Sequence, residues 1–204
     1  MFPDLPTVGA VTLEQTAATP PEYQQLDIGI AAFENVHHDE DSDLYGDWIF
    51  SEIRDNERHF LPFVLRNTLL ASNQWGAVRV LPLLDPSVDL SLTGTVHQSD
   101  GTRLVLQIKA TDSRGEVWLD KTYADTSLAT DYPDSTRLRS ANQLDDDDMV
   151  EPFFDLYAQI SNDLIAIRNQ KSEQELVNLR RVSELVYAND LAPESFGHTL
   201  LTDE

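Results

Sequence analysis

The segment from Val88 to Tyr123 alternates apolar and polar residues so regularly that it constrains the fold more than any other part of the chain. Its apolar positions form three runs: Val88, Leu90, Leu92, Gly94 and Val96; Leu104, Leu106, Ile108 and Ala110; and Val117, Leu119 and Tyr123. Turn signals separate the runs at Ser99-Asp100-Gly101 and Ser113-Arg114-Gly115. A period of two residues is typical of strands that bury one face. The segment therefore predicts three antiparallel strands with one apolar and one polar face.

The sequence before this segment predicts two more strands and a helix. The apolar runs 26–33 and 77–82 have the length and composition of buried strands. The polar, acidic residues 34–48, which follow the first run, are expected to form a loop. Residues 50–72 show helical spacing, with Leu61, Leu65 and Leu69 on one stripe. Pro62 is expected to start or kink this helix, because proline lacks the amide donor, and Asn73 is expected to end it. The helix is the expected cover for the apolar face of the sheet.

The C-terminal part of the chain predicts two helices and a third, short helix from Pro193. The first carries an apolar stripe of Phe153, Tyr157, Ile160, Leu164 and Ile167, and the second a stripe of Leu176, Leu179, Val182 and Val186. Residues 172–175 read Ser-Glu-Gln-Glu, which matches a capping box at the start of the second helix. The helices join at Gln170-Lys171, so we expect an antiparallel hairpin that needs a surface to pack on.

These elements predict an α+β fold, with a mostly antiparallel sheet covered by a long helix and followed by a C-terminal helical hairpin. Four regions follow along the chain. Residues 1–25, with four prolines, are expected to form an extended tail, and residues 26–125 an α/β sandwich domain. Residues 126–148, which end in four aspartates, are expected to be an acidic linker, and residues 149–204 the helical hairpin region.

The charge and the cysteine count exclude several functions. The formal net charge is −22, from 36 acidic and 14 basic residues, so the chain repels nucleic-acid phosphates and we expect no nucleic-acid partner. A net charge of this size either keeps the protein soluble or attracts a basic partner. There are no cysteines, which excludes disulfides, thiol nucleophiles and cysteine-based metal sites. No run of 18 apolar residues exists, so no transmembrane segment is expected.

Two acidic stretches are the candidates for metal binding. Residues 37–43 read HHDEDSD and contain His37, His38, Asp39, Glu40, Asp41 and Asp43. Adjacent histidines point apart and no second histidine follows at i+4, so we interpret this stretch as a solvated loop. The run of aspartates at 145–148 lacks the glycine and carbonyl scaffold of a calcium loop. No metal ligand and no cofactor are assigned.

No residue is assigned a catalytic role either. Ser195 lies in PESFG, which is not a G-x-S-x-G elbow. The remaining histidines, His59, His97 and His198, are scattered, and no glycine-rich phosphate loop is present. Three tryptophans are expected to pack in or around the core: Trp48, Trp75 and Trp118.

Residues 26–125 resemble the domain group of the TolB amino-terminal domain and the curli-secretion protein CsgG, which includes the lipoprotein LpoB. The shared pattern is F-x-N, then a helix with L…L…S, a tryptophan before a V-x-V strand, a D-x-x-L-x-G-x-V strand and a D-x-x-G-x-V hairpin. The matching residues are Phe33, Asn35, Leu65, Leu69, Ser72, Trp75, Val78, Val80, Asp89, Leu92, Gly94, Val96, Asp112, Gly115 and Val117. Members of the group are non-catalytic envelope proteins, often outer-membrane lipoproteins, that bind other proteins and assemble.

The resemblance implies a non-enzymatic interaction module of the bacterial cell envelope, the periplasmic part of a lipoprotein anchored upstream of Met1 at the outer membrane. We expect a protein partner, or further copies of the chain, to contact an edge or the polar face of the sheet, by strand addition or helix docking. Two alternatives remain open: a metal-dependent hydrolase centred on His37, His38 and Asp39, and a cytosolic regulatory subunit with a basic partner.

Overall fold

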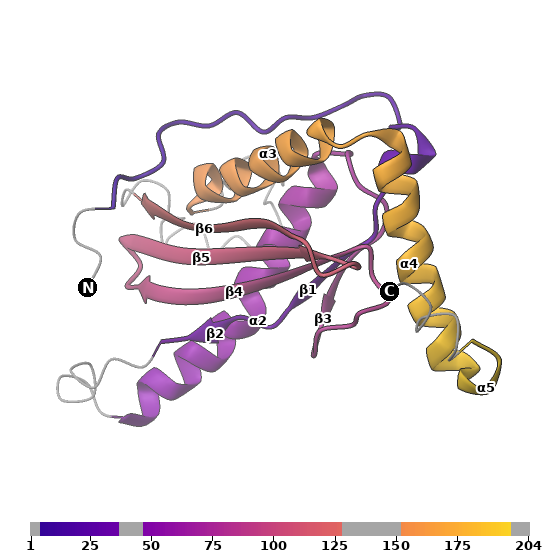
Figure 1. Cartoon of the computed structure of the whole chain (residues 1–204). Helices are drawn as coiled ribbons and strands as arrows, with labels where there is room; N and C mark the ends of the chain where they lie inside the picture. The colour runs from indigo at the N-terminus through magenta and orange to yellow at the C-terminus, as the bar shows by residue number, and fades with distance from the viewer. Residues whose placement is uncertain (1–4, 37–46, 128–151, 197–204) are drawn as a thin grey trace, which may run out of the picture.

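The computed structural model describes residues 5–36, 47–127 and 152–196, and of residues 47–55 it describes the backbone alone. These residues form the predicted α+β fold, which is built on one mixed sheet of six strands (Figure 1). The strand order is β3-β1-β4-β5-β6, and β2 also pairs with β4. The strands are β1 (Ile28–Ala31), β2 (Glu34–Asn35), β3 (Val78–Leu81), β4 (Leu90–Ser99), β5 (Arg103–Asp112) and β6 (Val117–Thr126).

The sheet combines both kinds of strand pairing. β1 runs parallel to β3 and to β4, whereas β4, β5 and β6 form the predicted antiparallel meander. Gly101 and Gly115 have φ angles of 81° and 84°, which confirms the two predicted turns. Parallel neighbours need a crossover, and the helix between β1 and β3 supplies it.

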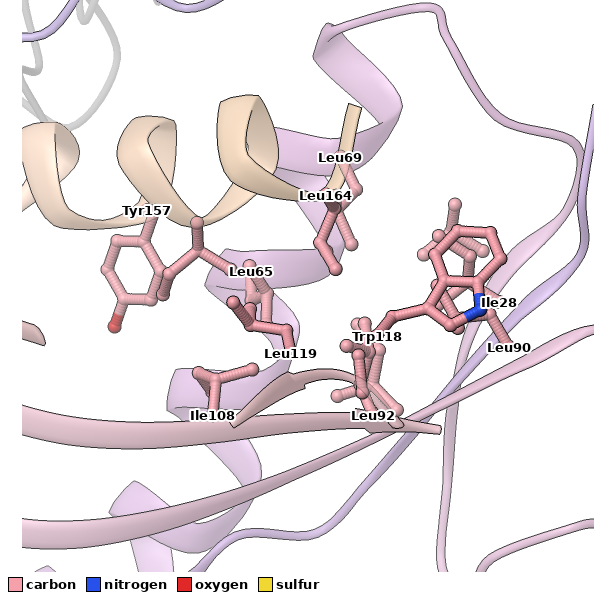
Figure 2. Close-up of a cluster of buried hydrophobic side chains, with 14 of the residues drawn as sticks. Ile28, Leu65, Leu69, Leu90, Leu92, Ile108, Trp118, Leu119, Tyr157 and Leu164 are labelled. Carbon is pink, nitrogen blue, oxygen red and sulfur yellow. The ribbon is translucent and has the colours of Figure 1, made fainter. Parts of the chain in front are cut away.

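Helices cover one face of this sheet. The helical elements are η1 (Glu22–Gln24), α2 (Asp47–Ala71), α3 (Phe154–Gln170), α4 (Glu173–Leu191) and α5 (Pro193–Phe196). Figure 2 shows Leu65 of α2 and Leu164 of α3 pointing toward Leu92, Ile108 and Leu119 of the sheet. The sheet, α2 and α3 therefore share one hydrophobic core, and each large apolar side chain buried there contributes roughly 1.5–3 kcal/mol.

Pro62 lies inside α2 and does not end it. A residue at this position would normally donate its amide to the carbonyl oxygen of Arg58, one turn earlier. That oxygen instead accepts the amide of Phe33 at 3.1 Å, and the Arg58 Nε donates to the Phe33 carbonyl oxygen at 3.2 Å. The proline thus frees a carbonyl group that fastens α2 to the segment between β1 and β2. Asn73, with φ of 54°, follows the end of the helix as predicted.

Two local expectations are corrected. The expected loop 34–48 opens with β2, whose Glu34 and Asn35 pair in parallel with Thr95 and Val96. A two-residue strand has no measurable period, so periodicity does not reveal it. The expected apolar position Val117 is 47% exposed, whereas Trp118 is buried, because the pairing register shifts between Ala110 and Thr111. The resulting bulge turns Trp118 toward the core.

The two predicted C-terminal helices are present as α3 and α4, but they do not pack against each other as the expected antiparallel hairpin. The capping box is formed: the amide of Glu175 donates to the Ser172 side chain, and the amide of Ser172 donates to the Glu175 side chain. Figure 1 shows that α4 turns away from α3 and runs past the end of the sheet rather than alongside its neighbour. No helix in the described ranges is long and apolar enough to cross a membrane.

The N-terminal segment from Leu5 to Pro21 has no regular secondary structure, but it is fastened to the body of the protein. The amide of Val8 donates to the Ala124 carbonyl oxygen at 2.8 Å. The side chain of Asn162 donates to the Thr12 carbonyl oxygen and accepts the amide of Glu14, both at 2.9 Å. The segment therefore follows the outer surface of α3 toward η1 (Figure 1).

Candidate protein-interaction surface

Asp89, one of the residues of the family-like pattern, joins three elements. It is 3% exposed, and its Oδ2 accepts the backbone amide of Asp27 at 2.8 Å, just before β1. Its Oδ1 accepts a hydrogen bond from the hydroxyl group of Ser183 on α4. The Arg180 Nε lies 3.6 Å from Oδ2 and supplies a counter-charge. Asp89 therefore positions α4 against the start of the sheet.

Asp112, a second residue of the pattern, holds the β5–β6 hairpin. Its Oδ1 accepts the amides of Arg114 and Glu116 at 2.9 and 3.0 Å. Its Oδ2 accepts the Trp118 Nε1 hydrogen at 3.1 Å, which satisfies the polar atom of the buried indole. All of these contacts are internal to the fold, so Asp112 is a structural carboxylate.

Gly94 and Phe33 are also paired by packing. A Cβ atom added at Gly94 would lie 2.5 Å from the nearest ring carbon of Phe33, which is fully buried. Only glycine leaves room for the ring at this position. The pattern residues Phe33, Gly94, Asp89 and Asp112 thus hold the fold together, and we find the interaction surface elsewhere.

Arg168 is a buried cation that sequence reasoning missed. It is 2% exposed, and its guanidinium group lies 4.9 Å from the ring centroid of Trp75. Its Nη atoms donate to the Gln74 carbonyl oxygen, and to the Gln74 Oε1 at 2.9 Å. Burial lowers the pKa of Arg168, an effect that the nearby Tyr23 opposes. Arg168 links α3 to the turn before β3.

The residues considered for metal binding fall in parts of the chain that the structure does not describe. His37, His38, Asp39, Glu40, Asp41, Asp43 and the aspartates at 145–148 lie outside the described residues. Within the described ranges, no group of three or more histidine, aspartate or glutamate side chains is placed to hold a metal ion.

The described residues that were considered for catalysis lie on different elements of the fold. Ser195 is exposed on the short α5 helix, and His59 is exposed on α2. His97 lies on β4 beside Gln107, and its Nε2 is 3.2 Å from the Gln107 Oε1. His198 lies outside the described residues. Ser195, His59 and His97 thus belong to three separate elements.

Two of the three tryptophans are placed in the core as expected. Trp75 and Trp118 are each 8% exposed, and the Lys171 ammonium group lies 4.9 Å from the Trp118 ring centroid. The side chain of Trp48 lies outside the described residues.

The first half of α4 is firmly attached to the rest of the protein. Leu176 and Leu179 are buried in the core, and the Leu179 carbonyl oxygen accepts the Ser113 hydroxyl hydrogen at 2.7 Å. Arg180 donates to the carbonyl oxygens of Glu22 and Gln25 and so holds η1. An open hollow of about 360 Å³ lies between η1 and this half of α4. The attachment ends at Ser183, the last buried residue of the helix.

Beyond Ser183 the helix extends into solvent, and we call residues 184–196 the α4 arm. Figure 1 shows the arm running past the sheet and ending in α5. Three large apolar side chains on it remain open to solvent: Tyr187 is 55% exposed, Leu191 67% and Phe196 38%. Exposed apolar groups that gather on a projecting element mark interaction sites. Exposed large apolar side chains also lie on α2 and after β3, but those of α2 directly neighbour buried residues, and those after β3 lie outside any helix or strand. We therefore take the α4 arm as the candidate protein-interaction surface.

The face of the sheet opposite the helices carries polar side chains, as the alternation predicts, although Val105 of β5 on this face is fully buried. Gln107 on β5 lies at its centre, where its Oε1 is 3.2 Å from the His97 Nε2 and its Nε2 donates to the Asp120 Oδ1 at 2.8 Å. The side chains thus form a hydrogen-bonded line across β4, β5 and β6. The expected partner contact through this face or a sheet edge stays a prediction. The α4 arm is an alternative contact surface.

Asp163 on α3 ties this helix to β6. Its Oδ2 accepts hydrogen bonds from Tyr123 and Lys121, and its Oδ1 from Gln159, all at 2.7 Å. Burial by itself would raise the pKa of Asp163, but these hydrogen bonds and the Lys121 charge outweigh it, so the pKa lies below its ordinary value of 3.8. Burial and the hydrogen bond from the Tyr123 hydroxyl group to Asp163 raise the pKa of Tyr123.

Replacing Asp163 with asparagine is expected to lower the free energy of unfolding at neutral pH by about 1 kcal/mol, a modest value because Lys121 is solvent-screened. A depressed carboxyl pKa stabilises the fold above the unfolded-state pKa, and this contribution is lost as the pH falls. The gap between wild type and D163N should therefore begin to narrow below pH 3.8 and close as the pH falls through the lower pKa of Asp163 in the folded state. Urea unfolding from pH 7 to pH 2 measures it, with D120N as the control, and a gap that is constant with pH would contradict the assignment.

Comparisons with known proteins give only distant similarities. No protein-family model and no curated protein match the sequence. The hypothetical protein CT253 from Chlamydia trachomatis is similar in structure at 9% identity, over 80% of this chain and 99% of that chain, with a TM-score of 0.38. A putative neuraminyllactose-binding hemagglutinin homolog from Helicobacter pylori is similar at 9% identity, over 83% of this chain and 94% of that chain, with a TM-score of 0.27. Similarities at this level assign neither a fold family nor a function.

Proposed function

We propose that the chain is a non-enzymatic interaction and assembly module of the bacterial cell envelope, the soluble part of a periplasmic lipoprotein that binds a protein partner. The observation that carries the binding role is the α4 arm. Its side chains Tyr187, Leu191 and Phe196 are exposed, whereas most large apolar side chains of the described residues are buried in the core. Water contact with these side chains is unfavourable, so covering them with a partner releases free energy.

The way α4 is held also supports a binding role. Asp89 and Arg180 fix the first half of the helix, so the α4 arm is presented in a defined direction and not on a free tail. A pre-ordered helix loses less conformational entropy when a partner docks than a disordered segment does. The arm is thus arranged as a preformed docking element.

The envelope location is supported by the resemblance of residues 26–125 to the TolB amino-terminal and CsgG-like group. In this proposal the protein is periplasmic and is associated with the outer membrane. The net charge of −22 favours a protein partner over a nucleic acid.

Site-specific photo-crosslinking tests this function. A benzoylphenylalanine side chain is placed at Leu191 in cells of the source organism, and at Phe60, a 54% exposed residue of α2, as the matched control. We expect one envelope protein to be cross-linked through position 191 and not through position 60, and mass spectrometry then identifies it. Cross-links only to cytosolic proteins would contradict the envelope location, and no specific cross-link at 191 would contradict the binding role of the arm.

A further inference from the structure

We propose that the partner docks an amphipathic helix on the α4 arm, and that this helix carries an apolar stripe flanked by lysine or arginine. This inference rests on the proposed function and specifies the chemistry of the partner. Three properties of the arm support it: its surface pattern, its charge and its backbone.

The exposed surface of the arm combines apolar and acidic side chains on one stripe. Glu184, Tyr187 and Leu191 follow one another at i, i+3 and i+7, and Asp190 lies beside Leu191, three residues after Tyr187. All four side chains are exposed. A partner that covers Tyr187 and Leu191 therefore also meets the carboxylates of Glu184 and Asp190.

The charge at this end of the chain has one sign. Residues 182–204 contain five acidic residues and neither lysine nor arginine. Arg180, at the base of the arm, donates to backbone carbonyl oxygens of η1. The exposed Arg181 is the cation nearest the arm in the sequence, and it lies before the apolar residues Tyr187 and Leu191. Carboxylates beside an apolar surface are best matched by cations flanking an apolar stripe. The exposed ring of Tyr187 offers such a cation a second favourable contact.

A second copy of the chain is a poorer match for this surface. Two arms packed side by side would bring Glu184, Asp190 and Glu194 of one copy close to the same residues of the other. Like charges at an interface are destabilising, and each copy also carries a net charge of −22. The charge pattern therefore favours a basic partner over self-association.

The backbone of the arm favours a helix as the docking element. Amide and carbonyl groups inside α4 are used by the helix itself, so the arm offers no strand edge for β-addition. Contact must then occur through side chains, and helices meet through side chains at i, i+3, i+4 and i+7. The exposed stripe of the arm has this spacing.

Fluorescence anisotropy with designed peptides tests the inference on the full-length protein. The probe is a capped, labelled peptide of about 18 leucine and lysine residues, long enough to form a helix, with leucine on one face. One control peptide has the same composition with leucine on all faces, and a second has glutamate in place of lysine. We expect binding of the amphipathic lysine peptide, at least tenfold weaker binding of both controls, and weakening by added salt.

Paired variants locate the binding site. E184K/D190K is expected to bind the probe roughly tenfold more weakly, whereas E14K/E34K, with the same change in net charge at exposed distant positions, should stay within about twofold. Y187S/L191S should lose binding, and F60S/F63S, which removes exposed apolar groups from α2, should not. Circular dichroism and thermal unfolding confirm that each variant is folded.

Several outcomes would overturn the inference. Equal losses in the two charge-reversed variants would show nonspecific attraction to an acidic protein. Preferential binding of the glutamate peptide would show the opposite partner chemistry. A wild-type dimer that Y187S/L191S dissociates in analytical ultracentrifugation would make a second copy the occupant. If the partner cross-linked through Leu191 contacts it with a segment lacking lysine and arginine, this inference fails while the proposed function stands.

Discussion

Replacing Gly94 with alanine is expected to destabilise the fold by about 3 kcal/mol. The added Cβ atom would lie 2.5 Å from the ring of Phe33, far closer than two carbon atoms can approach. The ring has little room to move away, because it is fully buried. The backbone of Phe33 is also fastened on both sides, since its amide and carbonyl groups are hydrogen-bonded to Arg58. β4 or the Phe33 segment must therefore shift, and packing is lost.

Urea unfolding measures this loss, and Gly9→Ala is the matched control because a Cβ atom added at Gly9 meets no atom within 4 Å. The control should change the free energy of unfolding by less than about 0.5 kcal/mol. The double variant G94A/F33L tests the cause, since a smaller side chain at position 33 should relieve part of the crowding. A G94A variant as stable as wild type would contradict the described packing of Phe33 on β4.

Replacing Asp89 with alanine is expected to cost about 3 kcal/mol and to loosen α4. The change removes the acceptor of the Asp27 amide and leaves the Ser183 hydroxyl group with only the Arg180 carbonyl oxygen, at 2.8 Å, as its acceptor. It also leaves Arg180 without its nearby counter-charge. A shielded amide without an acceptor, as at Asp27, is costly, because it loses its hydrogen bond to water as well. Limited proteolysis should then cut within α4 faster than in the wild-type protein.

Two companion variants separate this effect from a general loss of stability. Asp89→Asn keeps one oxygen acceptor and removes the charge, so we expect an intermediate loss. Asp85→Ala, at an exposed residue whose carboxylate accepts hydrogen bonds from Ser87, should cost less than about 1 kcal/mol and leave the α4 cleavage rate unchanged. Faster cleavage spread evenly over the chain in D89A would contradict a specific role for Asp89 in positioning α4.

The alternating segment 88–123 carries most of the information about the fold. Leu92, Ile108 and Leu119 occupy the buried face that the period of two residues predicts, and Leu61, Leu65 and Leu69 of α2 cover it. The capping box at Ser172 and the turns at Gly101 and Gly115 are also as predicted. These features depend on neighbours close in sequence, which is why a single sequence reveals them.

The remaining features depend on contacts between distant segments. The Arg168 guanidinium group stacks on Trp75 and reaches Gln74, which is 94 residues away along the chain, and no local pattern predicts such a buried cation. The bulge that buries Trp118 in place of Val117 depends on pairing with β5. The direction of α4 depends on Asp89, whose partner Ser183 lies far along the chain.

The candidate surface is only partly visible in the sequence. The predicted stripe of the second C-terminal helix, Leu176, Leu179, Val182 and Val186, leaves Tyr187 and Leu191 outside it. These two apolar residues off the stripe, together with the lack of lysine and arginine after Arg181, are the signals that point to the α4 arm. Their meaning requires the structure, because the sequence does not show that α4 extends past the sheet.

Hydrogen–deuterium exchange with the cross-linked partner tests the central claim most directly. Amide exchange is followed by mass spectrometry on the full-length protein, alone and with the purified partner in excess. If the partner docks on the α4 arm, exchange should slow in residues 184–196 and stay unchanged in β4 and β5. Slower exchange confined to the polar face or the edges of the sheet, with none in the arm, would contradict the account.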